Sequence, residues 1–422
     1  MTDRTPALLG GAPAFPDGLP LLRPSLPDPG TVLPGIHDAL ASGMLTKGSA
    51  LRRYEAKVAD HLGVEHVVAV SSCTAGLMLV FQAIAEANGV RPAPAAVGPD
   101  GAAATATVAR PRALMPSFTF MATAMAAVWA GLEPVFCDID PLTWNLSPAG
   151  VEAVLADPDL GFGAALLVPV HIFGNPADTA AFERLGREHG LAVVYDAAHG
   201  FGALNEGHPV GREGYAQCFS TSPTKLQITA EGGIVATGDE ALAERLVAGR
   251  DYGNPGDYDA LFCGLNARLS ELHALLGIAG LDVLEAEAVA RNELAAHYRE
   301  LLGEVPGVTF QHIADGDRSS YKDVSVRIGG AFALTRDQLA AALKAEGVDT
   351  RAYYVPPVHR MRAFGAFTER YEPLLPETAA LCDEVLTLPC YGSMTAADVA
   401  AVAAAIAAAH ERGAEIRAAL GA

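Results

Sequence analysis

A single lysine, Lys225, lies between two stretches with strand character. It is the only Lys or Arg from residue 213 to residue 242, in the segment CFSTSPTKLQITAEGGIVAT (218–237). Its neighbours are small or hydroxyl residues, so a pocket is expected there, and burial favours the neutral amine. A neutral amine can attack a carbonyl group and form a Schiff base. The alternative is a buried lysine whose ammonium is paired with Glu231.

Asp196 follows four apolar residues, Ala-Val-Val-Tyr, and should be largely desolvated. A buried carboxylate needs a partner, because an unpaired one would take up a proton. That partner could be a protein cation or the protonated ring nitrogen of pyridoxal phosphate (PLP), whose electronics an aspartate tunes. The alternative is that Asp196 caps a loop or pairs with His199.

The turn Ser-Ser-Cys-Thr-Ala-Gly (71–76) lies between a β-branched run, 67–70, and an apolar helix, 77–87. A strand, a turn and a helix in this order direct the N–H groups of the first helical turn at an anion such as phosphate. Ser and Thr also cap helices without any ligand. Together, Lys225, Asp196 and this turn indicate a PLP site more specifically than each does alone.

Seven short strands alternate with helices along the chain, which predicts an α/β fold with a mainly parallel, doubly wound sheet. The predicted strands are 67–70, 113–115, 134–138, 164–170, 192–196, 218–221 and 233–237. Ligands bind such sheets at the carboxyl ends of the strands. Asp196, His199, Ser220 and the turn at 72–76 all fall at such ends.

The same pattern predicts two domains and the segments that join them. The predicted parts are an N-terminal arm and helices (1–62, irregular to 35), a large α/β domain (63–255), interdomain helices (256–299) and a small α+β domain (300–422). Residues 89–111 are rich in Ala, Pro and Gly and are interpreted as a flexible surface insertion without chemistry.

Composition excludes several classes of function. The net charge of −20 over 422 residues disfavours nucleic-acid and anionic-membrane partners, which need clustered Lys and Arg. The six cysteines are scattered without a CxxC pair, which predicts reduced core cysteines, no metal site and a cytoplasmic protein. We find no signal peptide and no apolar run long enough to cross a bilayer.

From about residue 35 to residue 409, the chain resembles the DegT/DnrJ/EryC1/StrS sugar aminotransferases, which are PLP enzymes of fold type I. The matching segments are VSSCTAGL (70–77), PSFTFMAT (116–123), PVHIFGNPAD (169–178), YDAAHGFGA (195–203), FSTSPTKLQITAEGGIVAT (219–237), GLNARLSELHALLG (264–277), YYVPPVH (353–359) and LTLPCYGSMTAADV (386–399). Two positions depart from the usual pattern: Ala267 stands where Tyr is common, and Cys73 where Gly is common. Lys225 argues against the family's dehydratase branch, in which His replaces the lysine.

The resemblance implies a role for each matching residue. Lys225 would bind PLP and move the proton, Asp196 would pair with the pyridinium nitrogen, His199 would bond the phenolic oxygen, and Phe120 would stack on the ring. The implied phosphate contacts are Cys73, Thr74, Ala75 and Ser220. Asn266 resembles the asparagine that reaches the phosphate in the neighbouring subunit, which implies a homodimer with shared sites.

The resemblance also implies the substrates: a keto-sugar, expected to be nucleotide-linked, and glutamate or glutamine as amino donor, in amino-sugar or antibiotic biosynthesis. Alternatives are a keto-cyclitol, suggested by the LLGGAP start (8–13), another natural-product ketone, or a PLP-binding regulatory protein without turnover. The candidate substrate contacts are His171, Tyr353 and His359, although a core histidine and a Pro-rich turn packed by tyrosines explain them equally well. The candidate diphosphate contacts are Arg250, Arg268, Arg351 and Arg360.

Overall fold

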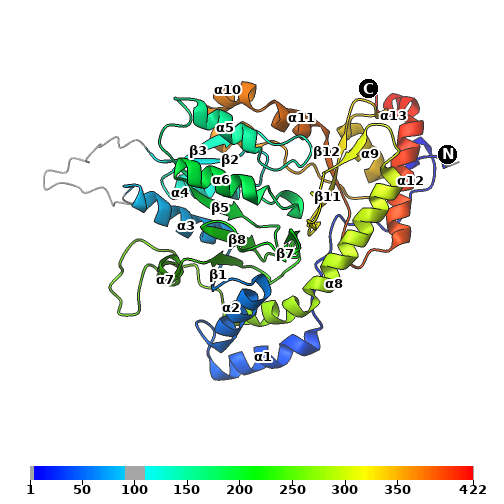
Figure 1. Ribbon diagram of the computed structural model, residues 1–422. Helices are drawn as coiled ribbons and strands as arrows, with labels where there is room; N and C mark the ends of the chain where they lie inside the picture. The colour runs from blue at the N-terminus through cyan, green and yellow to red at the C-terminus, as the bar shows by residue number, and fades with distance from the viewer. Residues whose placement is uncertain (1–3, 91–109, 422) are drawn as a thin grey trace.

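The computed structural model describes residues 4–90 and 110–421 (Figure 1). The predicted insertion spans residues 89–111, and its residues 91–109 lie outside the described part of the chain. A seven-stranded sheet in the order β1-β9-β8-β5-β4-β2-β3 forms the large domain. Its strands are β1 (His66–Val70), β2 (Arg112–Pro116), β3 (Glu133–Cys137), β4 (Ala164–Leu167), β5 (Ala192–Asp196), β8 (Ala216–Ser220) and β9 (Gly233–Thr237). Only β9 runs antiparallel to its neighbours, so the predicted mainly parallel sheet is confirmed.

Helices pack on the sheet through apolar faces. One of them, α3 (Cys73–Ala87), crosses β8 and β9, while α2 (Ser49–Leu62) packs on β1 and on α8 (Glu271–Leu302), below β1 in Figure 1. The other helices of this domain are α4 (Ala122–Trp129), α5 (Pro148–Ala156), α6 (Thr179–His189) and α7 (Glu240–Gly249). Strands β6 (Leu204–Asn205) and β7 (His208–Pro209) form a separate two-stranded sheet.

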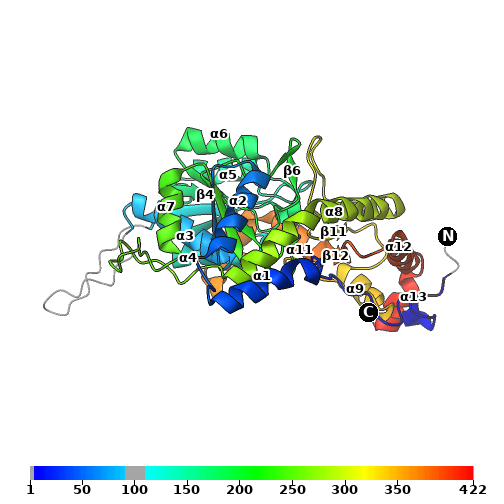
Figure 2. The ribbon, with the colours of Figure 1, turned by 90° about the horizontal axis from the view of Figure 1, so that it is seen from below.

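The small domain is built on a three-stranded antiparallel sheet. Its strands are β10 (Val308–Phe310), β11 (Val324–Ile328) and β12 (Val385–Leu388), and its helices are α9 (Arg336–Ala345), α12 (Ala396–Glu411) and α13 (Gly413–Leu420). A single 32-residue helix, α8, runs from the large domain to this one, where several helices were predicted (Figures 1 and 2). No helix in residues 4–90 or 110–421 combines the length and apolarity needed to cross a membrane.

The N-terminal arm differs from its prediction in two ways. Helix α1 (Pro29–Ser42) begins inside the segment predicted to be irregular, because the Asp28 side chain accepts a hydrogen bond from Gly30 N–H and Pro29 occupies the first turn. Upstream of it, Leu19 is buried in the small-domain core and pairs with Val348. The arm therefore joins the domain at the other end of the sequence.

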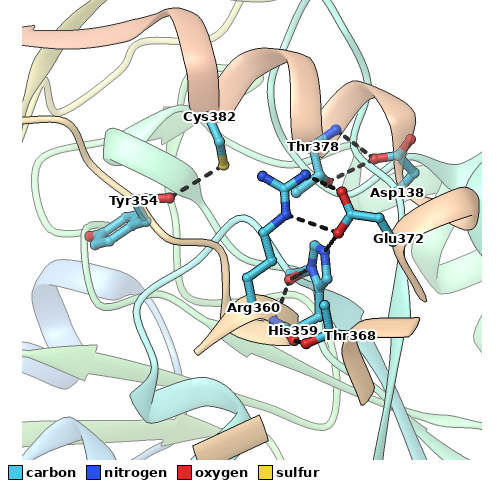
Figure 3. Close-up of polar contacts among 9 residues, drawn as sticks. Asp138, Tyr354, His359, Arg360, Thr368, Glu372, Thr378 and Cys382 are labelled. Atoms are coloured by element: carbon cyan, nitrogen blue, oxygen red, sulfur yellow. Dashed lines mark hydrogen bonds and ion pairs between the residues drawn. The ribbon is translucent and has the colours of Figure 1, made fainter. Parts of the chain in front are cut away.

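A segment predicted to belong to the small domain packs on the large one. Phe136, on β3, makes edge-to-face contacts with Phe364, Phe367 and Tyr371. This contact places α10 (Thr368–Tyr371) and α11 (Pro376–Glu384) beside the large domain, near α5 in Figure 1. Asp138 then accepts hydrogen bonds from the first turn of α11, including both the N–H and the hydroxyl of Thr378 (Figure 3).

Helix α2 begins after Gly48, which has no side chain to cap it. Instead, the buried carboxylate of Glu271 accepts hydrogen bonds from the N–H groups of Gly48, Ala50 and Leu51 at 2.9, 2.8 and 3.1 Å. These bonds satisfy donors that a helix start leaves unpaired. They also fix α2 to the start of α8.

We therefore expect Glu271→Ala to lower the free energy of unfolding by about 2–3 kcal/mol, because buried N–H groups lose their acceptor. Urea denaturation followed by circular dichroism measures this. Glu293→Ala, at an exposed position on the same helix, is the matched control and should change stability by less than about 0.5 kcal/mol. Equal losses in the two variants would contradict the capping role.

Candidate active site

A cavity of about 380 Å³ lies at the carboxyl ends of β5 and β8. The large domain contributes Ser72, Cys73, Thr74, Leu77, Phe120, Ala122, Asp196, Ala198, His199, Ser220, Ser222, Thr224, Lys225, Glu231 and Gly232, and the small-domain side contributes Lys322, Tyr353 and Tyr354. Most residues predicted for cofactor binding therefore meet in one space. Both domains enclose it.

Lys225 lies in the loop between β8 and β9 and is partly buried. Burial and, after it, the positive charge of Lys322 lower the pKa of the Lys225 amine to about 8. The other charges acting on it include Asp323 and Asp196, but not Glu231, which is exposed. Near neutral pH such an amine is still mostly protonated, but its neutral fraction, which attack on a carbonyl requires, is far larger than that of an ordinary lysine.

Asp196 ends β5 and is buried. Its carboxylate accepts hydrogen bonds from the Thr123 hydroxyl at 2.7 Å and from Ala198 N–H at 3.1 Å, which are neutral donors. Burial raises the pKa of Asp196 above its ordinary value, and these bonds lower it in part. The carboxylate lines the cavity as an anion that a cationic ligand atom would stabilise.

His199 is buried, and its two ring nitrogens have different surroundings. Nδ1 accepts a hydrogen bond from Phe173 N–H at 3.1 Å, so the proton of the neutral ring is on Nε2, 3.4 Å from the Tyr354 hydroxyl. Burial, and then the charge of Lys225, hold the pKa of His199 well below its ordinary value. The ring thus offers a neutral N–H donor to the cavity.

The predicted phosphate turn forms the start of α3. Ser72 caps this helix by accepting from Ala75 N–H at 3.1 Å, so Ala75 does not line the cavity and that expectation is corrected. Cys73 and Thr74 do line it, and their N–H groups donate to no acceptor within the described residues. A Cβ on Gly233 would lie 2.4 Å from the Cys73 nitrogen, so only glycine lets β9 pass this close to the turn.

Two histidines predicted as substrate contacts lie outside the cavity. The His171 ring stacks on Tyr195 with centroids 5.2 Å apart, and its Nδ1 accepts from Ala177 N–H. His359 is buried, with Nδ1 2.7 Å from the Ser117 hydroxyl and Nε2 3.2 Å from Glu372 (Figure 3). Both rings are core groups, and the expectation for them is corrected. Tyr353, by contrast, lines the cavity.

Asn266 is exposed and does not line the cavity of its own chain. Of the four candidate arginines, three pair with carboxylates: Arg250 with Glu55, Arg268 with Asp251, and Arg360 with Glu372 (the last in Figure 3). Arg351 is exposed and donates to the carbonyl of Thr350.

Lys322 reaches the cavity, although the sequence analysis did not select it, and Tyr354 of the matching segment 353–359 lines the cavity beside Tyr353. The Lys322 ammonium donates to both carboxylate oxygens of Asp323 at 2.9 and 2.8 Å. The sequence did contain a signal for Lys322. It and Asp323 are adjacent charged residues directly before strand β11, where buried residues are expected.

A larger hollow of about 870 Å³ lies between α2, β1 and α7. Four glutamates line it, and its one arginine, Arg245, pairs with Glu86. This negative lining does not suit a phosphate-bearing cofactor.

The five buried cysteines and the exposed Cys263 are all free, so the expectation of core cysteines is wrong for Cys263.

Comparison with known proteins identifies the family. The family model described as the DegT/DnrJ/EryC1/StrS aminotransferase family matches residues 31–407. The chain belongs to this family. It is 31% identical to the pleiotropic regulatory protein of Geobacillus stearothermophilus (84% of this chain, 88% of that one) and 30% identical to the UDP-N-acetyl-3-dehydro-alpha-D-glucosamine 3-aminotransferase of Acidithiobacillus ferrooxidans (89% and 92%). The crystal structure of DesI in the presence of its TDP-sugar product superposes with a TM-score of 0.84, 34% identity and 99% coverage of both chains.

The protein is thus a PLP-dependent aminotransferase, and the cavity fits this cofactor. Asp196 is buried and forms no ion pair with the part of the chain that the structure describes, so its carboxylate suits a protonated ring nitrogen. The start of α3 supplies unpaired N–H groups for a phosphate. Lys225 supplies an amine for the aldehyde, and the exposed face of Phe120 is available for stacking.

The rate at which the cofactor-free protein takes up PLP should rise with pH and level off above about 8, because only the neutral Lys225 amine attacks the aldehyde. Stopped-flow measurement of the visible absorbance band gives this profile. Lys225→Ala should give no such band, whereas Lys344→Ala, at an exposed position on α9, should behave as wild type. A rate still rising steeply near pH 10 would contradict a desolvated Lys225.

Proposed function

We propose that this protein transfers an amino group from glutamate or glutamine to a nucleotide-linked keto-sugar in amino-sugar biosynthesis. The observation that carries this is that Lys225, Asp196 and His199 share one cavity with the free N–H groups of α3. Relatives whose activity is named act on such sugars, as in the UDP-sugar aminotransferase and in DesI with its TDP-sugar product. The free cysteines suit a cytoplasmic setting.

Each residue has a defined task in this reaction. When bound, PLP supplies an electron sink that stabilises negative charge at the substrate carbon that loses its proton. Lys225 Nζ takes that proton from the donor and returns one, as a base with a pKa of about 8 can near neutral pH. Asp196 keeps the ring nitrogen protonated. His199 donates from Nε2 to the phenolic oxygen, and its neutral state persists across the working pH range because its pKa is lowered.

The nucleotide of the acceptor needs a cation outside the cavity, because the diphosphate is several bonds from the ketone. Arg351 is the best placed of the four candidate arginines. It is exposed, has no carboxylate partner within the described residues, and stands two positions before Tyr353, which lines the cavity. We therefore assign Arg351 to the diphosphate.

A homodimer with shared sites belongs to the same proposal. Leu33, Leu40 and Met44 form an exposed apolar strip on and just after α1, which lies along α8 on the lower face of the molecule (Figure 2). A bridge between Thr46 and Ser270 places this strip beside the segment that carries Asn266. A second copy packed here would cover the strip and receive Asn266 near its phosphate site.

Mixing two inactive variants tests this arrangement. Lys225→Ala and Asn266→Ala subunits, unfolded and refolded together, should regain up to about a quarter of the wild-type activity per site, because half of the dimers then hold one intact site. Neither variant alone should reach this level. If Asn266 served its own chain, no intact site could form and mixing would restore nothing.

The acceptor is tested with a panel of UDP-, GDP- and TDP-linked keto-sugars and a keto-cyclitol. L-glutamate or L-glutamine should convert the visible band to an ultraviolet one, and one nucleotide sugar should restore the visible band and gain an amine by mass spectrometry. Restoration by the cyclitol alone would overturn the nucleotide-sugar assignment. A visible band that neither donor shifts would overturn the donor assignment.

A further inference from the structure

Lys322 is a buried cation from the small-domain side of the cavity. Its side chain is 5% exposed, lines the same space as Lys225, and holds its ammonium 5.2 Å from the centre of the Tyr353 ring. Taking an ammonium out of water is costly unless it has a counter-charge. Asp323 supplies that charge with two contacts, and an ammonium has three N–H donors, so one donor is left for a ligand.

The backbone around Lys322 is held in place from α8. Arg291 is buried, pairs with Glu287 at 2.6 Å and donates to the carbonyls of Tyr321 and Lys322. Tyr321 has a φ of +44°, a conformation that side chains rarely adopt. The buried Arg291–Glu287 pair and the strained Tyr321 therefore both position Lys322. Such strain is typical of functional sites, which indicates that Lys322 binds a ligand.

Among the described residues that line the cavity, Lys225 and Lys322 are the only Lys or Arg. Lys225 is occupied by the chemistry, so Lys322 is the remaining cation for an anionic group of a substrate. The two substrates differ in where their anions lie. An amino acid carries its α-carboxylate on the reacting carbon itself, whereas the diphosphate of a nucleotide sugar is several bonds from the ketone.

We propose that Lys322, positioned by Asp323, binds the α-carboxylate of the amino donor and so determines that the donor is an α-amino acid. This rests on the proposed transamination. The carboxylate must lie inside the cavity with the reacting carbon, and Lys322 is the cation that lies there. Charge complementarity in a desolvated site gives the contact its strength.

Lys322→Met tests the contact by removing the charge while keeping a long side chain. 2-Methyl-L-glutamate keeps the α-carboxylate but has no proton to lose from Cα, so its reaction with the PLP-loaded protein stops before proton transfer and calorimetry measures association without turnover. We expect its dissociation constant to rise about 10- to 100-fold, the usual effect of losing a charged hydrogen bond. Lys322→Arg should restore most of the affinity.

The ligand provides the control for a purely structural role. 4-Aminobutyrate lacks the α-carboxylate, so its binding should be unchanged in Lys322→Met. Lys344→Met, on the surface of α9, should match wild type in every assay.

Lys322→Met leaves the Asp323 carboxylate buried without a partner, which could prevent folding. The double variant Lys322→Met/Asp323→Asn removes both charges and should show the same selective loss. Equal weakening for 2-methyl-L-glutamate and 4-aminobutyrate, or no weakening for either, would overturn the proposal. Because donor binding is measured without a sugar, a wrong acceptor assignment would show separately, as failed transfer by the wild type.

Discussion

Desolvation at the meeting point of the two domains is the constraint on which this structure depends. The same low-dielectric space shifts three groups in the directions that disfavour their charged forms: the pKa values of Lys225 and His199 fall, and that of Asp196 rises. An exposed version of the same residues would hold a lysine with its ordinary, high pKa and a solvated carboxylate. Neither would suit PLP chemistry.

Lys322 and Lys225 show how position sets the character of one residue type. Both line the cavity, but only Lys322 has a carboxylate within 3 Å. The positive charge of Lys322 is itself one of the causes that lower the pKa of Lys225. The environment therefore gives the two lysines different roles: Lys322 is paired with a carboxylate, and Lys225 is left to act as a base.

Contacts between segments far apart in the chain hold the elements of this fold together. Glu271 fixes α2 to α8, Asp138 caps α11 from the end of β3, and Arg291 holds the backbone at Lys322. Each contact joins residues more than 30 positions apart. The chain crosses between the domains repeatedly, so the small-domain side of the cavity is assembled from two separate segments, at Lys322 and at 353–354.

Sequence by itself determined the sheet, its mainly parallel order and the grouping of Lys225, Asp196, His199 and the α3 turn, because strand periodicity and the strand-end rule are local signals. The roles assigned to these residues remain predictions from the family resemblance. Tertiary structure alone decided that His171 and His359 are core groups, that Ala75 turns away from the cavity, and that Lys322 enters it. Whether a polar side chain faces a ligand or the core depends on contacts between segments far apart in the chain, such as Phe136 with Tyr371, and no local pattern encodes those contacts.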